Sequence, residues 1–247
     1  MFPKYLLIVV GLLTFATSNI SCERDEGVME KEKHSEDSSG QQEREYSWYE
    51  LGQENPFNKR VLDVRPLTWN VVASTTDKAI AEKYLKLRNS DGYDLVGSSP
   101  SDALTTKCDL SYPHNGEDLR GIVFKADSMD VKWDIYIYDS VFYFSRSWSG
   151  ALIYKARATI SDTKIHISSV EYARGAADAE LAVQNVHFLI KTHALGGVYP
   201  HAIPKSIPDD PEQIAAYSFS ELGNKACYAT REGILDVTVD VREEENE

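Results

Sequence analysis

Residues 133–172 read WDIYIYDSVFYFSRSWSGALIYKARATISDTKIHISSVEY, a series of β-branched and aromatic runs separated by short polar breaks. The runs cover residues 133–138, 141–148, 151–160 and 164–172. Each break contains a two-residue turn candidate: Asp139-Ser140, Ser149-Gly150 and Ser161-Asp162. This pattern is typical of strands joined by hairpins. Because such short connections force neighbouring strands to be antiparallel, the stretch predicts a β-meander, which a further run at 122–124 extends.

The segments on either side of the meander predict mainly helices. Apolar residues recur at helical spacing in three segments, 77–88, 178–194 and 211–222. Residues 60–73 have the composition of an extended segment, and a short strand is expected near 226–230. Residues 92–119 are rich in Pro, Gly, Ser and Asp and predict an irregular loop. The fold class is therefore α+β, with a twisted antiparallel meander of four to six strands and about three helices packed mainly on one face.

The chain begins with an apolar leader that is too short to span a membrane. Lys4 supplies a positive charge, and residues 5–16 are apolar except for Thr14. A helix needs about 20 apolar residues to cross a bilayer, so the dozen present here predict an export signal. Residues 1–21 are accordingly expected to be a signal peptide.

A cysteine follows the leader directly and suggests how the exported chain is held. The sequence Asn19-Ile20-Ser21-Cys22 resembles the lipobox of bacterial lipoproteins, with Asn19 where that motif usually has Leu. The resemblance covers the leader alone. It implies that Cys22 is acylated with fatty acids such as palmitate, becomes the new N-terminus and anchors the chain to a membrane of the cell envelope, at the bacterial outer membrane or the periplasmic side. Residues 22–45 would then be a disordered acidic tether.

Two other interpretations of the leader remain open. Ala16-Thr17-Ser18 places small residues where an ordinary signal peptidase cuts, which would release a soluble secreted protein. In a secretory protein that is not bacterial, Asn19-Ile20-Ser21 would also be a glycosylation site.

The net charge of −13 is concentrated in the two tails. Residues 22–46 contain nine acidic and four basic residues, and residues 236–247 contain six and one. The predicted single domain at 46–235 is therefore close to an ordinary charge balance, and 236–247 is expected to be an acidic C-terminal tail. Nucleic-acid binding is not expected, because no basic face or cluster of basic and aromatic residues occurs.

Three cysteines occur in the chain, at positions 22, 108 and 227. If Cys22 carries lipid, Cys108 and Cys227 remain as a possible disulfide in an exported protein. The alternative is that they are two separate buried thiols, because free cysteine packs as a small apolar side chain.

The meander is unusually rich in aromatic residues, and both faces of its strands carry large side chains. Tyr136 and Tyr138 alternate with Ile135 and Ile137, so a tyrosine-bearing face is a candidate platform for a saccharide, a peptide or a partner protein. Arg146 is the candidate partner for a ligand carboxylate, although an internal ion pair or cation–π contact would also explain it.

Catalytic motifs are missing from the sequence. It contains no Gly-x-Ser-x-Gly elbow, phosphate-binding loop, dinucleotide-binding glycine motif or His-Glu-x-x-His, so no catalytic residue, metal site or cofactor is assigned. The function expected is non-enzymatic ligand or protein binding. One alternative is an exported hydrolase that uses a histidine with carboxylates, drawn from His193, His201, Asp209, Asp210 and Asp134. Another is an envelope immunity or inhibitor protein. The oligomeric state is not predicted.

Overall fold

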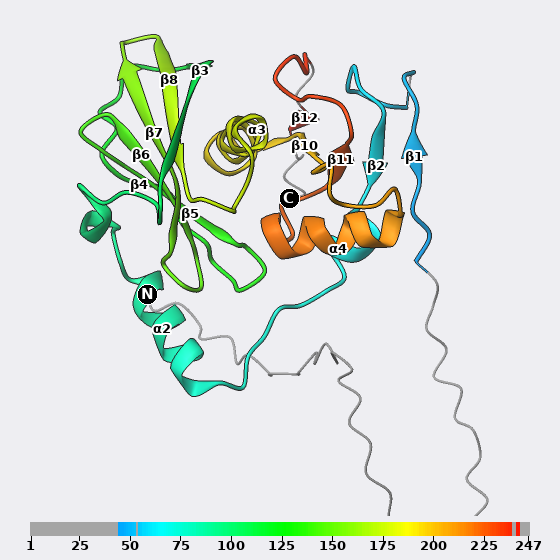
Figure 1. The fold of residues 1–247 in the computed structure, drawn as a ribbon, viewed down its shortest axis with the longest axis horizontal. Coiled ribbons are helices and arrows are strands. Elements are labelled where there is room, and N and C mark those ends of the chain that lie inside the picture. The colour runs from blue at the N-terminus through cyan, green and yellow to red at the C-terminus, as the bar shows by residue number, and fades with distance from the viewer. Residues whose placement is uncertain (1–43, 53, 239–240, 243–247) are drawn as a thin grey trace, which may run out of the picture.

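A computed structural model describes residues 44–52, 54–238 and 241–242. It confirms the α+β class: a six-stranded sheet and a four-stranded sheet lie on either side of helix α3 (Ala179–Leu189), which contacts strands of both (Figure 1). Among the described residues, none of the helices combines the length and the apolar character needed to cross a bilayer.

The six-stranded sheet is the predicted meander with one more strand at its edge. Its spatial order is β3-β8-β7-β6-β5-β4, and every neighbouring pair is antiparallel. Asp139 and Ser140 form the two-residue turn between β5 and β6, both with positive φ (49° and 60°), as a tight hairpin requires. The strands are β3 (Leu104–Pro113), β4 (Gly121–Phe124), β5 (Trp133–Tyr138), β6 (Val141–Arg146), β7 (Leu152–Ile160) and β8 (Lys164–Tyr172).

Strand β3 corrects the prediction of a loop over residues 92–119. It pairs with β8 along its whole length, with a bulge between Lys107 and Leu110. Most of its outward residues are Thr, Lys, Asp and Ser, which is the composition of a loop. Lys107, the bulge and Pro113 all hinder the pairing of a further strand with this edge of the sheet.

The four-stranded sheet is smaller and mixed. Its order is β1-β2-β11-β10, in which β10 and β11 are parallel and the other pairs antiparallel. The extended segment predicted at 60–73 is confirmed only in part, because β2 passes into the one-turn helix α1 (Arg65–Thr68), with Pro66 in its first turn. The strands are β1 (Trp48–Tyr49), β2 (Val61–Asp63), β10 (Pro200–Ala202) and β11 (Tyr228–Thr230); β9 (Gly197–Val198) pairs separately with β12 (Val241–Arg242).

Three of the four described α-helices begin at acidic caps. Asp77 accepts hydrogen bonds from Ala79 N and Ile80 N at the start of α2 (Lys78–Arg88), Asp178 caps α3, and Asp210 caps α4 (Pro211–Leu222). Helix α3 continues as a π-helical turn, η2 (Ile190–Ala194), and a short 3-10 helix, η1 (Tyr93–Leu95), follows α2. Two of the three predicted helices, α3 and α4, lie on the side of the sheet that faces the second sheet, whereas α2 packs at one end of the sheet (Figure 1).

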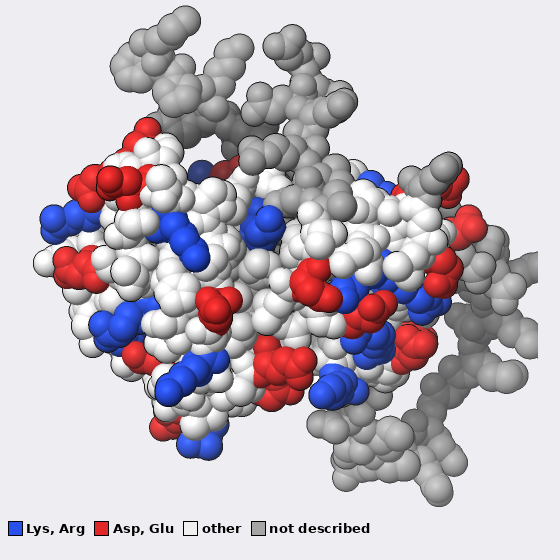
Figure 2. Space-filling model, turned by 90° about the horizontal axis from the view of Figure 1, so that it is seen from above, with Lys and Arg blue, Asp and Glu red and all other residues white. Residues whose placement is uncertain are grey.

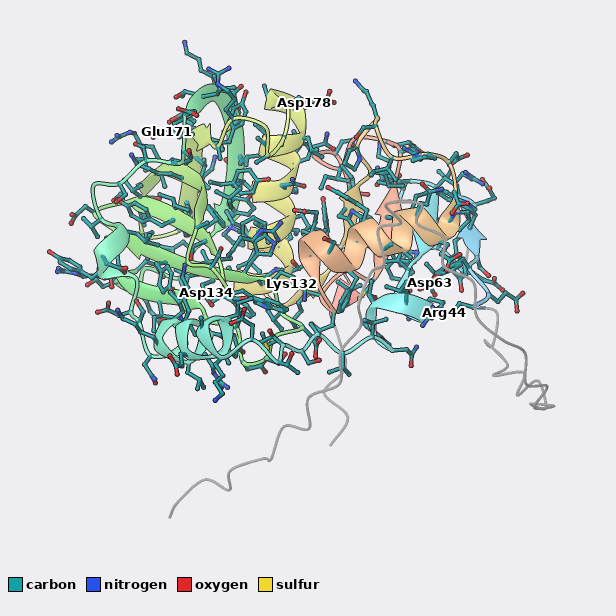
Figure 3. All side chains as sticks on the ribbon, turned by 60° about the horizontal axis from the view of Figure 1, so that its bottom comes forward. Arg44, Asp63, Lys132, Asp134, Glu171 and Asp178 are labelled. Atoms are coloured by element: carbon teal, nitrogen blue, oxygen red, sulfur yellow. The ribbon has the colours of Figure 1, made fainter. Side chains whose placement is uncertain are left out.

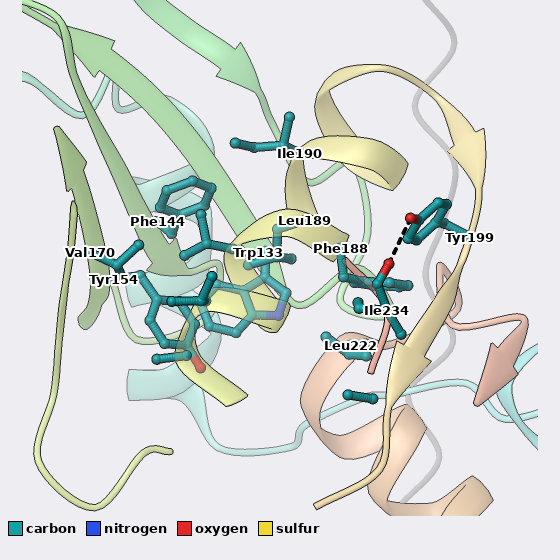
Figure 4. Close-up of a cluster of buried hydrophobic side chains, with 14 of the residues drawn as sticks. Trp133, Phe144, Tyr154, Val170, Phe188, Leu189, Ile190, Tyr199, Leu222 and Ile234 are labelled. Carbon is teal, nitrogen blue, oxygen red and sulfur yellow. Dashed lines mark hydrogen bonds between the residues drawn. The ribbon is translucent and has the colours of Figure 1, made fainter. Parts of the chain in front are cut away.

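One apolar core joins the two sheets and the helices between them. Trp133 lies at its centre, stacked on Tyr154 with the ring centroids 5.5 Å apart (Figure 4). The Trp133 indole Nε1 donates to the carbonyl oxygen of Glu221 at 2.7 Å, which attaches the end of α4 to β5. On the far side of the core, Tyr199 donates to the Ile234 carbonyl oxygen at 2.9 Å.

Candidate functional site

A polar groove of about 470 Å³ lies at one end of the six-stranded sheet. Three connections form it: the loop from β3 to β4, the turn from β5 to β6 and the turn from β7 to β8. In an antiparallel meander alternate connections fall at the same end of the sheet, so the fold brings these segments together. The groove is lined by His114, Gly116, Glu117, Asp118, Leu119, Arg120, Asp139, Ser140, Ile160, Ser161 and Asp162.

The first loop is fastened closely to the third connection. His114 N donates to Thr163 O at 2.9 Å, which continues the pairing of β3 with β8 beyond the strand. Gly116 has φ +83°, and a Cβ there would lie 3.3 Å from the Asp162 carbonyl oxygen. A glycine therefore suits the close approach of the loop to this turn.

The groove carries more negative than positive charge. Its lining contains one guanidinium, that of Arg120, and one imidazole, that of His114. Within the described part of the chain, four carboxylates of the lining form no ion pair: Glu117, Asp118, Asp139 and Asp162. Such a groove attracts cationic groups and hydrogen-bond donors. It has no aromatic lining residue on which a sugar ring would stack.

The tyrosine face predicted as a binding platform is buried, so the prediction that it is exposed is wrong. Tyr136 and Tyr138 are only 2% and 5% exposed. The segment 91–97, which includes η1, covers them: the Tyr138 hydroxyl donates to Asp91 O at 2.9 Å, and Gly97 N donates to the Tyr143 hydroxyl at 3.4 Å. This segment and the tyrosines form a second, small core on the outer face of the sheet.

Gly92 makes this covering possible. Its φ is +77°, and a Cβ at this position would lie 2.4 Å from the ring of Tyr136. Only a residue without a side chain lets the backbone rest directly on the ring. The sheet therefore has little free surface at Tyr136.

Asp134 belongs to a buried ionic group beneath the same face. Its carboxylate accepts hydrogen bonds from the Lys125 ammonium at 2.9 Å and from Ala126 N at 2.9 Å. Burial and the negative charge of Asp134 raise the pKa of the Tyr136 hydroxyl, which donates to that carboxylate at 3.1 Å. Figure 3 shows Asp134 in the sheet on the side of α2. The carboxylate is thus held by partners of the protein itself.

Arg146 forms internal contacts and is not directed at the groove. Its guanidinium pairs with the Glu221 carboxylate, donates to the Glu221 carbonyl oxygen at 2.6 Å and lies 4.5 Å from the ring centroid of Trp133. The internal ion pair and the cation–π contact considered from the sequence are therefore both present, and they fix α4 to β6.

Lys132 is a buried amine that the sequence pattern did not single out. It lies where the six-stranded sheet meets α4 (Figure 3), with its Nζ over the rings of Trp148 and Phe219 at 4.8 and 4.5 Å. Burial lowers its pKa to about 8. Its ammonium donates to Met129 O at 2.8 Å, so this side chain too is bound internally.

The residues of the hydrolase alternative do not assemble into a site. His201 is buried, with its Nε2 2.9 Å from Ser218 Oγ, whereas Asp209 pairs with Arg231 at the surface at 3.6 Å and Asp210 caps α4. Burial lowers the pKa of His193 to about 3 and that of His201 to about 4. No group of three or more His, Cys, Asp or Glu in the described ranges is arranged to hold a metal ion.

The two cysteines of the domain are separate thiols. Cys108 lies on β3 and Cys227 immediately before β11, and no disulfide joins them in the described structure. Burial raises the pKa of Cys108 to about 11, which makes it a poor nucleophile. Cys22 and the leader lie outside the described residues.

The groove residues were missed because they were assigned only to turns. Asp139-Ser140 and Ser161-Asp162 were correctly located between strands, but their meeting at one end of the sheet was not used. The cluster of polar residues at 114–120 was a further signal.

Comparisons with protein-family models, curated proteins and solved structures found no match to the chain, so the geometry of the groove is the ground for assigning a function.

Proposed function

We propose that this chain is an exported, lipid-anchored binding protein of the cell envelope, and that its folded part binds a positively charged ligand in the groove at the end of the six-stranded sheet. The anchor is the acylated sulfur of Cys22. The support for the anchor comes from the sequence: a short apolar leader, a cysteine directly after it and a hydrophilic stretch that links it to the described residues.

The observation that carries the binding function is the excess of groove carboxylates that form no ion pair with any described residue. Some charged residues elsewhere in the fold, such as Asp134, Arg146 and Glu171, do have opposite charges as partners. At the groove four carboxylates face one guanidinium, and a cationic group placed among them gains on the order of 1 kcal/mol per close charge pair, depending on its exposure to water.

The chemistry of the lining favours a partner protein over a saccharide. Saccharide sites are commonly built on exposed aromatic rings, and the groove is lined by none. A basic segment of a partner protein would complement the negative charge of the groove and could enter it from solvent. No observation among the described residues favours the hydrolase alternative.

Site-specific photocrosslinking in intact cells tests this proposal. A photoreactive amino acid at Glu117, inside the groove, is expected to form an adduct with a second protein, whereas the same amino acid at Glu212, an exposed acidic residue of α4, is expected to form none. Replacing Asp118 and Asp162 by asparagine should reduce the adduct at least about fivefold, because two charge pairs are lost.

Salt provides an independent check in isolated envelopes. The yield of the adduct should also fall as the salt concentration rises toward about 1 M, where the Debye length is about 3 Å. Equal adducts from positions 117 and 212, or an adduct that is indifferent to both the asparagine substitutions and salt, would contradict binding through the groove.

A further inference from the structure

Helix α2 is exposed over most of its surface. Of its eleven residues only Tyr84 is fully buried, and this one side chain joins the helix to the body of the protein together with the half-buried Leu87. Two large apolar residues of α2 face solvent, Leu85 at 58% and Ile80 at 40% exposure. Helices in folded proteins are stabilised mainly by packing an apolar face, so these exposed apolar side chains indicate a partner.

The segment that leads into α2 also carries exposed apolar side chains. Trp69 and Val72 are 53% and 68% exposed. They lie in the segment between α1 and α2. Four large apolar side chains are thus exposed within 17 positions of the chain.

The charge of α2 is opposite to that of the chain as a whole. The helix contains Lys78, Lys83, Lys86 and Arg88 against a single acidic residue, Glu82, in a chain of net charge −13. Its three lysines enter no ion pair within the described ranges. The face opposite α2, which Figure 2 shows, carries acidic and basic side chains interspersed.

A short helix with basic and exposed apolar residues is suited to an anionic lipid surface. Such helices lie in the plane of the bilayer, with apolar side chains inserted among the headgroups and lysines at the anionic phosphates. We infer that the side of α2 that carries Leu85 lies against the anionic bilayer that holds the lipid on Cys22; this inference rests on the anchor of the proposed function. A lipid anchor keeps the domain near the bilayer, so a weak second contact is enough to set its orientation.

This orientation would direct the groove away from the membrane. Leu87 of α2 packs at Gly150, in the connection between β6 and β7. That connection lies at the opposite end of the meander from the turns β5–β6 and β7–β8, which form the groove. A bilayer at α2 would therefore leave the groove open to a partner in the aqueous phase.

Fluorescence quenching by brominated lipids tests the orientation of the full-length, lipidated protein on vesicles. An environment-sensitive fluorophore is attached at Leu85→Cys and, as the control, at Leu235→Cys. Leu235 is 48% exposed and belongs to the segment between β11 and β12. The described part of that segment is drawn in red at the top of Figure 1. The thiols of Cys108 and Cys227 are at least partly buried and will label slowly.

With vesicles of phosphatidylethanolamine and phosphatidylglycerol at low salt, we expect at least threefold more quenching at position 85 than at position 235. Reversing the charges of the two lysines nearest the Leu85 side of the helix, with Lys78→Glu and Lys86→Glu, should abolish this difference, because each cation near an anionic surface changes the docked population about fivefold. The control variant, Lys164→Glu with Arg174→Glu, makes the same change of net charge at exposed sites away from α2. It should leave the difference in quenching between positions 85 and 235 unchanged.

Three results would overturn the inference. One is equal quenching at positions 85 and 235 in protein that floats with the vesicles, which leaves the anchor intact. Another is a blue-shifted fluorophore at position 85 before lipid is added, which would show that another part of the chain covers α2. The third is the absence of flotation, which would contradict the anchor and the docking together.

Discussion

Replacing Gly223 by alanine is expected to lower the free energy of unfolding by about 4 kcal/mol. Gly223 ends α4 with φ +73° and ψ −151°, a conformation that side chains other than that of glycine rarely adopt. A Cβ there would lie 1.8 Å from the backbone oxygen of Asp130, which cannot move without breaking the bridge between Val131 and Gly223. The strain of this backbone conformation and the clash with the Asp130 oxygen would therefore both lower the free energy of unfolding.

The matched control is Gly196→Ala. Gly196 also has positive φ (+68°) close after a helix, but a Cβ there meets nothing within 4 Å. Only the conformational strain remains, so a loss of about 1 kcal/mol is expected. Equilibrium denaturation of both variants measures the difference. Equal losses in the two would show that the contact between the end of α4 and the 130–131 segment is not tight.

Acidification from pH 7 to pH 5 is expected to destabilise the domain by roughly 5 kcal/mol through two buried histidines, His193 and His201, and the partly buried His187. Burial lowers the pKa of His187 to about 4, of His193 to about 3 and of His201 to about 4. In the unfolded chain each has a pKa of about 6.5. At a pH between the folded-state and unfolded-state pKa values, the unfolded state binds a proton at each histidine and the folded state does not. The neutral histidines therefore contribute their full stabilisation above about pH 6.5, and this contribution is lost as the pH falls.

Each histidine contributes about 2 kcal/mol of this change. Replacing His201 by glutamine removes one titrating group and keeps a polar partner for Ser218, so the slope of the unfolding free energy against pH should fall by about a third between pH 5 and 6.5. Denaturation midpoints measured across this range test it. A slope that is the same in the variant and the native chain would contradict the buried neutral state of His201.

The meander could be predicted because each of its strands and turns is marked by the residues of that same short stretch of sequence. Strands β5 to β8 consist of β-branched and aromatic residues, and the turns between them are short. Strand β3 was not predicted, although Leu104, Thr106, Cys108, Leu110 and Tyr112 alternate with polar residues along it. The threonine, serine and aspartate of an edge strand resemble those of a loop until the partner strand β8 is known.

The tyrosine face failed as a prediction for a different physical reason. The segment that covers Tyr136, residues 91–97, is too short to show a periodic apolar pattern, and its contact with the sheet combines the apolar side chains of Leu95 and Val96 with the close backbone approach at Gly92. The ion pair of Arg146 with Glu221 joins positions 75 residues apart. Contacts of this range follow from the tertiary fold and leave no trace in local periodicity.

The proposed binding groove and the inferred membrane helix lie at opposite ends of the meander. At one end, carboxylates that form no ion pair among the described residues line the groove proposed for a cationic partner. At the other end, Leu87 fixes a basic, partly apolar helix to the connection between β6 and β7. If the chain is anchored and docks through α2 as we propose, the groove would be presented to partners in the aqueous phase.

Metabolic labelling with a fatty-acid analogue decides whether the chain is anchored through Cys22. The native chain and a Cys108→Ser control should both incorporate the label, whereas Cys22→Ser should incorporate none, because a thiol at the new N-terminus is required for acylation of the exported chain. Equal labelling of Cys22→Ser and the native chain, or no labelling of any of the three, would contradict the lipid anchor.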